Sequence, residues 1–257
     1  MPTRRGPLRV VRLLPLLLVC GLAGCLPDVG PPAGEPSGAA SAPAPTFSAP
    51  PSPALTQEVG STVTVRSGDV ELVVSSSRPP GVDTDDASTT TVLDVGPDAP
   101  ATLTVGGDRT LAVNADGTAS VLDDGGTPVG GLTAPSGGAR LVPVDDASVQ
   151  IVSDLTGTAT TALGSRAVAA TDWGDREGGR SLAVTPTDWA RSAGLAGEGL
   201  VWAELVAAEP EVDTASMRDQ LTCHAVGAPD KPTWNLEPWR PDVGLAAVLA
   251  ARCNPTG

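Results

Sequence analysis

The sequence predicts a β-rich antiparallel module of the sandwich type, followed by a small α+β disulfide-bonded domain and preceded by a disordered N-terminal tether. Two observations predict this order. Short runs rich in Val, Leu and Thr recur through residues 60–165 with turn residues between them, as is typical of antiparallel sandwiches. In residues 170–257 the composition changes, because all five Trp, the only His and the only Lys lie there, beside helix start and stop signals.

Residues 1–24 have the pattern of a bacterial signal peptide. Four Arg precede the apolar stretch 13–19, which is too short to cross a bilayer as a helix. A Leu-Ala-Gly-Cys sequence ending at Cys25 follows and resembles the lipobox of bacterial lipoproteins. This resemblance implies cleavage before Cys25 and attachment of lipid to its sulfur. We therefore expect the lipid bilayer as a partner and an extracytoplasmic location on the outer face of the cell membrane. An ordinary secretory signal with an incidental Cys is the alternative.

The charge of the processed chain excludes one class of partner. Without residues 1–24 the chain has 12 basic against 30 acidic residues, a formal net charge of −18. A surface of this charge repels polyanions, so we expect no nucleic-acid partner.

Residues 25–59 begin at the Cys expected to be lipidated and continue as a Pro-, Ala- and Ser-rich linker. This composition has too few apolar residues to bury a core, so we expect the linker to be disordered. Extended Pro-rich chain rises about 3.1 Å per residue, which gives a reach on the order of 100 Å. The linker would hold the folded part away from the membrane.

The acidic β-rich domain of residues 60–165 is expected to contain many short strands. Its apolar residues often alternate with polar ones, which is the period of a strand with one buried face. Asp116-Gly117 predicts a hairpin, because a type I′ turn requires positive φ at both central residues. No Trp or Tyr lies in this range, so we expect a thin aliphatic core. The expected strands are STVTVRS, DVELVVS, TTTVLDV, ATLTV, RTLAVN, TASVLD, ARLVP and ASVQIVS.

Two acidic segments in this domain share one sequence. Asp-Asp-Ala-Ser occurs at 85–88 and again at 145–148, which indicates either two related β units or chance in a chain of this composition. The stretch from Asp83 also begins like a calcium-binding loop. Ala87 and Ser88 occupy its fifth and sixth positions, where an oxygen ligand and Gly are needed. We therefore expect a surface cluster of carboxylates here, without a metal.

The C-terminal range is expected to contain four helical or apolar segments. Thr or Asp residues that cap helices precede three of them, and Gly or Asn-Pro follows. The second segment is apolar except for Glu204, so helix and strand both remain open for it. The expected segments are Thr185 to Gly194, residues 200–208, Asp213 or Thr214 to Gly227, and Asp242 to Asn254.

Two cysteines remain after processing, Cys223 and Cys253. Outside the cytoplasm two such thiols usually pair, so we expect one disulfide that ties two helix ends together. A Cys/His metal site is the alternative. The range has a single His and no C-x-x-C spacing, so we expect neither a metal nor a cofactor.

His224 is the candidate catalytic residue. Met217, Leu221 and His224 are spaced i, i+4 and i+7, which places the imidazole on the apolar face of its helix. The simpler interpretation is a half-buried His that is hydrogen-bonded to a neighbour. The alternative is a general base or acid–base pair in which His224 acts with Glu237, Glu204 or Asp230. The sequence contains none of the common hydrolase motifs, such as G-x-S-x-G or H-E-x-x-H.

Trp234 and Trp239 lie five residues apart among three Pro. Each ring buries roughly 150–250 Å² when packed, so both could form the core of a domain with few other large residues. In that case we expect Glu237 and Arg240 to pair with each other or with the backbone. Otherwise Trp234, Trp239 and Arg240 are candidates for binding a glycan, a peptide or a wall polymer.

Three short sequences in the last third of the chain carry a resemblance. They are M-x-x-Q-x-x-C-H at 217–224, KPTWNLEPWRP at 231–241 and CNP at 253–255. Together they resemble the domain-of-unknown-function family number 2599, a small domain at the C-terminal end of exported bacterial proteins. The resemblance implies a domain and a compartment and gives no residue a role.

These observations favour a membrane-anchored, exported lipoprotein that binds an envelope or extracellular component and is not an enzyme. The alternative is an extracytoplasmic hydrolase that uses His224 with Glu237 or Glu204. A secreted effector or toxin is a third interpretation, which the acyl anchor disfavours because a toxin must leave the cell.

Overall fold

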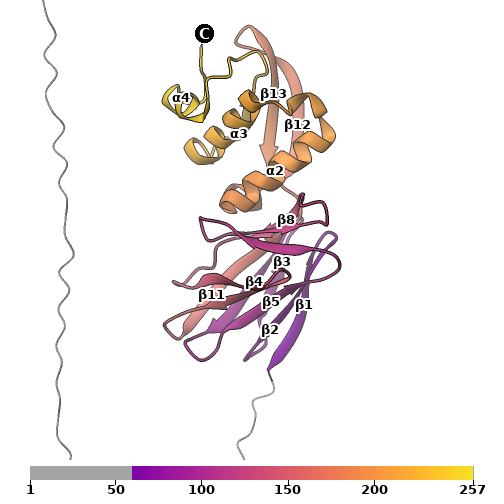
Figure 1. Cartoon of the computed structure of the whole chain (residues 1–257), viewed down its shortest axis with the longest axis vertical. Coiled ribbons are helices and arrows are strands. Elements are labelled where there is room, and N and C mark those ends of the chain that lie inside the picture. The colour runs from indigo at the N-terminus through magenta and orange to yellow at the C-terminus, as the bar shows by residue number, and fades with distance from the viewer. Residues whose placement is uncertain (1–59, 257) are drawn as a thin grey trace, which may run out of the picture. The chain divides into compact units, whose positions relative to one another are not determined.

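Figure 1 shows the computed structural model of the chain, which describes residues 60–256. The expected signal peptide, Cys25 and the linker of residues 25–59 lie outside the described residues. The described part consists of antiparallel sheets and a small C-terminal part with helices and a disulfide. The predicted fold class is therefore confirmed.

Two antiparallel sheets form the β sandwich. The first has five strands in the order β1-β2-β5-β10-β9, and the second has six in the order β3-β4-β11-β8-β7-β6. The strands of the first sheet are β1 Ser61–Ser67, β2 Val70–Ser76, β5 Ala101–Val105, β10 Ser148–Val152 and β9 Arg140–Asp145. Those of the second are β3 Gly81–Thr84, β4 Ser88–Val95, β11 Gly157–Gly164, β8 Pro128–Leu132, β7 Ala119–Leu122 and β6 Thr110–Val113.

The sandwich core is aliphatic, as the composition predicts. Alternate residues of β2 point inward, so Val70, Leu72 and Val74 are almost fully buried. They pack in one cluster with Leu93 and Leu132 from the opposite sheet. Each buried aliphatic side chain contributes about 1.5–3 kcal/mol, and many of them together hold the sheets without any aromatic residue.

The repeated Asp-Asp-Ala-Ser sequence forms the same turn in two hairpins. Oδ1 of Asp85 accepts hydrogen bonds from the N–H groups of Ala87 and Ser88 at 2.8 and 2.7 Å, between β3 and β4. Oδ1 of Asp145 accepts one from Ala147 N–H at 2.9 Å, between β9 and β10. The N–H donors of Ala87 and Ser88 lower the pKa of Asp85. Local turn chemistry is therefore enough to account for the repeat.

The C-terminal domain contains a three-stranded antiparallel sheet in the order β12-β13-β14. The expected strands included none between residues 168 and 186, where the exposed strand β12 shows little alternation of polar and apolar residues. The hairpin turns at Glu177 and Gly178, which both have positive φ. The strands are β12 Val168–Arg176, β13 Gly179–Pro186 and β14 Trp234–Leu236.

Four α-helices and one 3-10 helix complete this domain (Figure 1). They are α1 Asp188–Ser192, α2 Gly194–Ala208, η1 Pro210–Val212, α3 Ala215–Gly227 and α4 Leu245–Ala250. Within residues 60–256, no helix combines the length and apolar character needed to span a membrane.

The first two expected helix boundaries are wrong. Thr187, not Thr185, caps α1, because its side chain accepts the N–H of Ala190 while the preceding residues remain in β13. Gly194 was expected to end this helix, but with φ of 50° it instead begins α2. The apolar segment 200–208 is the second half of α2, so it is helical.

The later boundaries agree in part. Thr214 caps α3 by accepting the N–H of Met217 at 3.3 Å, which decides between the two expected caps. Asp242 does not cap the last helix. That helix starts after Gly244, whose φ is 79°, and ends at Ala250.

Side chains of the sandwich cap the start of α2. Oδ2 of Asp116 accepts the N–H of Leu195 at 2.7 Å, and Oγ1 of Thr118 accepts that of Ala196 at 3.3 Å. Burial acts to raise the pKa of Asp116, but the hydrogen bonds that its carboxylate accepts from Leu195 and Thr118 outweigh this effect, so the pKa lies below its ordinary value. The helix receives its N-terminal partners from another part of the chain, which its own sequence does not supply.

Trp189 joins the domain to the sandwich by close packing. Its Nε1 donates to the carbonyl of Ala162 at 3.1 Å. A Cβ atom on Gly164, the last residue of β11, would overlap the indole ring. Gly is therefore required here by the approach of the ring.

Candidate functional site

The two Trp of the WNLEPWRP run have opposite environments. Trp234 lies on β14 with 1% of its surface exposed, and its Nε1 donates to the carbonyl of Ala228 at 3.2 Å. Trp239 is 43% exposed. It lies against Gly179 at the hairpin and against the Arg240 guanidinium, 4.6 Å from its ring centre. Only one of the two rings therefore belongs to the core.

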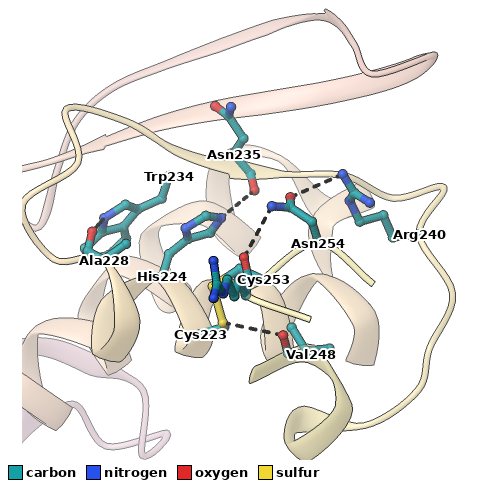
Figure 2. Close-up of a disulfide and its surroundings, with 10 residues drawn as sticks. Cys223, His224, Ala228, Trp234, Asn235, Arg240, Val248, Cys253 and Asn254 are labelled. Atoms are coloured by element: carbon teal, nitrogen blue, oxygen red, sulfur yellow. Dashed lines mark hydrogen bonds between the residues drawn. A yellow bond between two sulfur atoms is a disulfide. The ribbon is translucent and has the colours of Figure 1, made fainter. Parts of the chain in front are cut away.

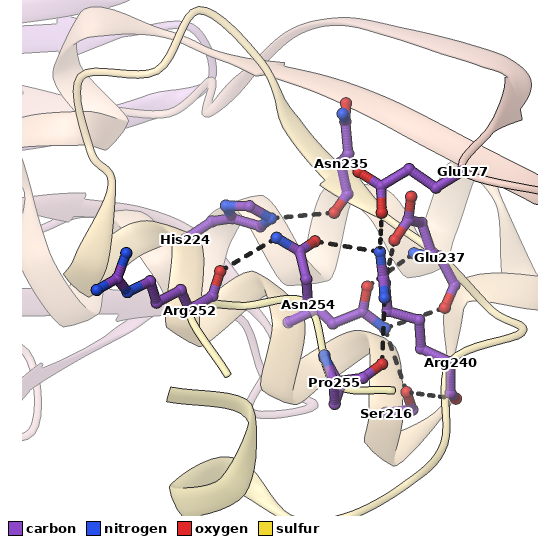
Figure 3. Close-up of polar contacts among 10 residues, drawn as sticks. Glu177, Ser216, His224, Asn235, Glu237, Arg240, Arg252, Asn254 and Pro255 are labelled. Atoms are coloured by element: carbon purple, nitrogen blue, oxygen red, sulfur yellow. Dashed lines mark hydrogen bonds and ion pairs between the residues drawn. The ribbon is translucent and has the colours of Figure 1, made fainter. Parts of the chain in front are cut away.

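Arg240 is buried and directs four of its five N–H donors to other residues of the chain (Figure 3). Its Nε donates to Glu237, so these two buried residues pair as expected. One terminal nitrogen donates to the carbonyl of Pro255 at 3.1 Å. The other donates to Glu177 at 2.5 Å and to Asn254 at 3.2 Å. One guanidinium thus holds together the hairpin tip, the WNLEPWRP run and the C-terminal tail.

The polar network continues into α3. Gln220 accepts the N–H of Glu237 at 2.9 Å and donates to the carbonyl of the same residue at 3.0 Å. Ser216 donates to the carbonyl of Arg240 at 3.1 Å. Both side chains are buried. The polar side chains of this run therefore bond mainly to the chain itself, and four of the five N–H donors of Arg240 are used in this way.

The predicted disulfide between Cys223 and Cys253 is confirmed (Figure 2). Cys223 lies in α3, and Cys253 follows α4 with φ of 70°. Both residues are buried. The bridge consumes both thiols, so neither serves as a nucleophile or a metal ligand. Among residues 60–256 no group of three His, Cys, Asp or Glu is arranged to hold a metal ion.

His224 is buried on the apolar face of α3 beside Met217 and Leu221. Its Nε2 donates to the carbonyl of Asn235 at 3.1 Å, so Nδ1 is the unprotonated nitrogen (Figure 2). Nδ1 is buried and has no hydrogen-bond partner among the described residues. Burial is the main cause that lowers the pKa of His224, and the positive charge of Lys231 lowers it further. The hydrogen bond to the Asn235 carbonyl acts in the opposite direction and is outweighed.

Two of the three candidate partners of His224 are engaged elsewhere, and the third, Asp230, is exposed. Glu237 pairs with Arg240. Glu204 accepts the N–H groups of Ala167 and Val168, both at 2.8 Å. Burial raises the pKa of Glu204, and these two bonds only partly offset the increase. In the described residues, then, the imidazole forms no hydrogen bond with a carboxylate, so it lacks the partner that the hydrolase hypothesis requires.

We predict that the stability of this domain decreases in acid because of His224. The unfolded state binds a proton below pH 6.5, the ordinary pKa of the group, while the folded state keeps the imidazole neutral. Stability should therefore be complete above this pH and fall as pH decreases towards the folded pKa, by at most about 1.4 kcal/mol per pH unit. Chemical unfolding followed by Trp fluorescence between pH 7.5 and 5.5 measures this.

His224→Gln provides the control, because Gln can donate to the same carbonyl and does not titrate. The variant should lose the part of the pH dependence that lies just below pH 6.5. An unchanged dependence in the variant would show that another group is responsible.

A cavity of about 390 Å³ lies beside Trp234. Apolar side chains form most of its wall, and three charged residues join them: Asp116 from the sandwich, Arg191 from α1 and Glu198 from α2. The sequence predicted Trp234 as a candidate and missed the three charged residues, because they lie far apart in the chain. The remaining lining residues are Ala115, Ala190, Gly194, Leu195, Ala225 and Val226.

Comparison with known proteins identifies the C-terminal domain. Residues 168–256 match a family described as "Protein of unknown function (DUF2599)". The C-terminal domain belongs to the DUF2599 family. The resemblance seen in the sequence is thereby confirmed. The DUF2599 domain contains both bridge cysteines, His224 and the whole WNLEPWRP run, and it comprises all strands and helices from β12 to α4.

The relatives of known sequence carry no assigned activity. The chain is 44% identical over 98 residues to "Uncharacterized protein Rv0477" of Mycobacterium tuberculosis, covering 35% of this chain and 66% of the relative. The match to "Uncharacterized protein Mb0487" of Mycobacterium bovis has the same extent. "Uncharacterized protein ML2452" of Mycobacterium leprae is 40% identical over 58 residues, 21% of this chain and 47% of the relative. This chain therefore spans just under two thirds of the length of the first two relatives. No solved structure matches significantly.

Proposed function

We propose that this protein is an exported lipoprotein, anchored to the outer face of the cell membrane through Cys25, and that its DUF2599 domain is a binding module for an envelope or extracellular component. The lipobox-like sequence ending at Cys25 supports the anchor. The buried disulfide between Cys223 and Cys253 supports maturation outside the cytoplasm.

The difference between the bonded polar groups and the open cavity favours a binding function over catalysis. The groups that could do chemistry are bonded to their own chain: Arg240 and Glu237 are buried, and Glu204 is half-buried. The cavity beside Trp234, in contrast, is open to solvent and is mainly apolar with a few charged groups. Such a composition is typical of sites that bind small molecules.

The anchor is tested on the full-length chain expressed in a bacterium with its own signal. We expect intact-mass measurement to show a chain that begins at Cys25 and carries a diacylglyceryl group. We also expect the protein to partition into the detergent phase. Cys25→Ser should abolish both properties, since each buried CH₂ contributes about 0.8 kcal/mol to membrane binding. A wild-type chain with an unmodified Cys25 would refute the anchor and leave the binding site to be tested separately.

A further inference from the structure

We propose that the cavity beside Trp234 binds an apolar molecule that carries a positively charged nitrogen. The inference rests on the proposed binding function and names the ligand class for that site. It follows from three observations: the apolar walls of the cavity, the carboxylate of Glu198, and the contacts that Arg191 makes with its own chain.

The walls of the cavity favour an apolar body. The indole of Trp234 lies beside Leu195 from α2 and beside Ala225 and Val226 from α3. Leu195 is 44% exposed and Val226 is 70% exposed, so both leave apolar surface in contact with water. A ligand that covers this surface gains roughly 25 cal/mol per Å². A volume near 390 Å³ lies in the range of small-molecule sites.

Glu198 supplies an acceptor that the protein only half satisfies. The residue is 6% exposed and lines the cavity. Its Oε1 accepts the Thr222 hydroxyl at 2.7 Å and lies 3.3 Å from the Arg218 guanidinium. Oε2 receives no hydrogen bond from residues 60–256. A carboxylate can accept about four hydrogen bonds, so Oε2 keeps acceptor capacity for a donor from a ligand.

Asp116 adds a second negative charge to the same wall. Its pKa lies below the ordinary value because its hydrogen bonds outweigh the effect of burial, so the group is ionised at neutral pH. It accepts the Leu195 N–H through one oxygen and two bonds from Thr118 through the other. Asp116 therefore disfavours an anionic ligand, and Glu198, whose charge Arg218 partly offsets, acts in the same direction.

Arg191 is the lining cation, and it uses three of its five N–H donors to hold the backbone of its own chain. Its guanidinium donates to three backbone carbonyls at 2.5, 2.7 and 2.9 Å. It also lies 5.5 Å from the centre of the Trp234 ring. These contacts hold the segment that leads into β14. The carbonyls belong to Pro229, Lys231 and Pro232.

The test uses three probes with the same alkyl chain: hexylammonium, hexanoate and hexanol. They are titrated by calorimetry into the full-length chain carrying Cys25→Ser, purified with its disulfide intact. We expect hexylammonium to bind at least about tenfold more tightly than hexanoate or hexanol, since a charge-assisted hydrogen bond to Glu198 is available only to the ammonium group. Glu198→Gln should reduce this preference to within about threefold.

Val226→Trp fills the cavity from an exposed helix position and therefore should block hexylammonium without unfolding the protein. Leu155→Trp is the matched control, because Leu155 is 76% exposed and does not line the cavity. Equal binding of hexanoate or hexanol would overturn the ligand class and leave the binding function standing. Hexylammonium binding that survives Val226→Trp would place the site elsewhere and overturn the inference. Failure of all three probes to bind would overturn both the inference and the proposed binding site.

Discussion

Arg240→Ala should destabilise the DUF2599 domain by about 3–5 kcal/mol, because removing one partner of a buried ion pair leaves the other charge uncompensated. Glu237 would remain buried without its cation. The carbonyl of Pro255 and the side chain of Asn254 would lose their donor at the same time. Urea unfolding followed by Trp fluorescence measures the loss, since all five Trp lie in this domain.

Two further variants separate charge from geometry. Arg180→Ala removes an ion pair with Glu211 in which both side chains are about half exposed, together with a contact to Trp173. It should cost only about 1 kcal/mol. Arg240→Lys keeps the charge but loses the planar fork, so its effect should lie between the two. An Arg240→Ala variant no less stable than Arg180→Ala would show that the buried network does not hold the domain together.

Loss of the disulfide should have an effect of similar size. A bridge between residues 30 positions apart contributes about 3.5–4 kcal/mol by restricting the unfolded chain. For a domain of this size such a loss lowers Tm by roughly 15 °C or more. We expect this decrease in the Cys223→Ser, Cys253→Ser double variant, measured by Trp fluorescence during heating.

The sandwich offers an internal control for the bridge. Its core lies in residues 60–165, which contain no Trp, so Trp fluorescence reports the C-terminal domain, whereas far-ultraviolet circular dichroism reports both parts together. The double variant should shift the fluorescence transition more than the dichroism transition, and a reductant should not shift it further. If the reduced wild type shows free thiols by mass and an unchanged fluorescence transition, the bridge is not a source of stability.

These effects concern the same part of the chain as the proposed site. Arg240 and the disulfide hold the C-terminal tail and the WNLEPWRP run. Arg191 holds the segment before β14. Trp234 therefore lines the cavity from a backbone that is fixed on both sides. A preorganised site loses less conformational entropy when a ligand binds.

Features that depend on neighbouring residues in the chain could be predicted from the sequence. Alternation such as that of Val70, Leu72 and Val74 specifies a strand with one buried face. Asp85 and Asp145 each bond the backbone two residues on, so their turns depend on neighbours in the chain. Cys223 and Cys253 were predicted to pair because no other partner remained for either thiol.

Features that depend on distant contacts were decided only by the tertiary structure. The sequence could not separate Trp234 from Trp239, because burial depends on what the fold places over each ring. Gly194 starts a helix since Asp116, from the sandwich, supplies the missing cap. The cavity likewise joins Asp116, Arg191 and Glu198 from separate elements. Propensity and turn chemistry act over a few residues, whereas burial and cavity formation depend on packing between segments far apart in the chain.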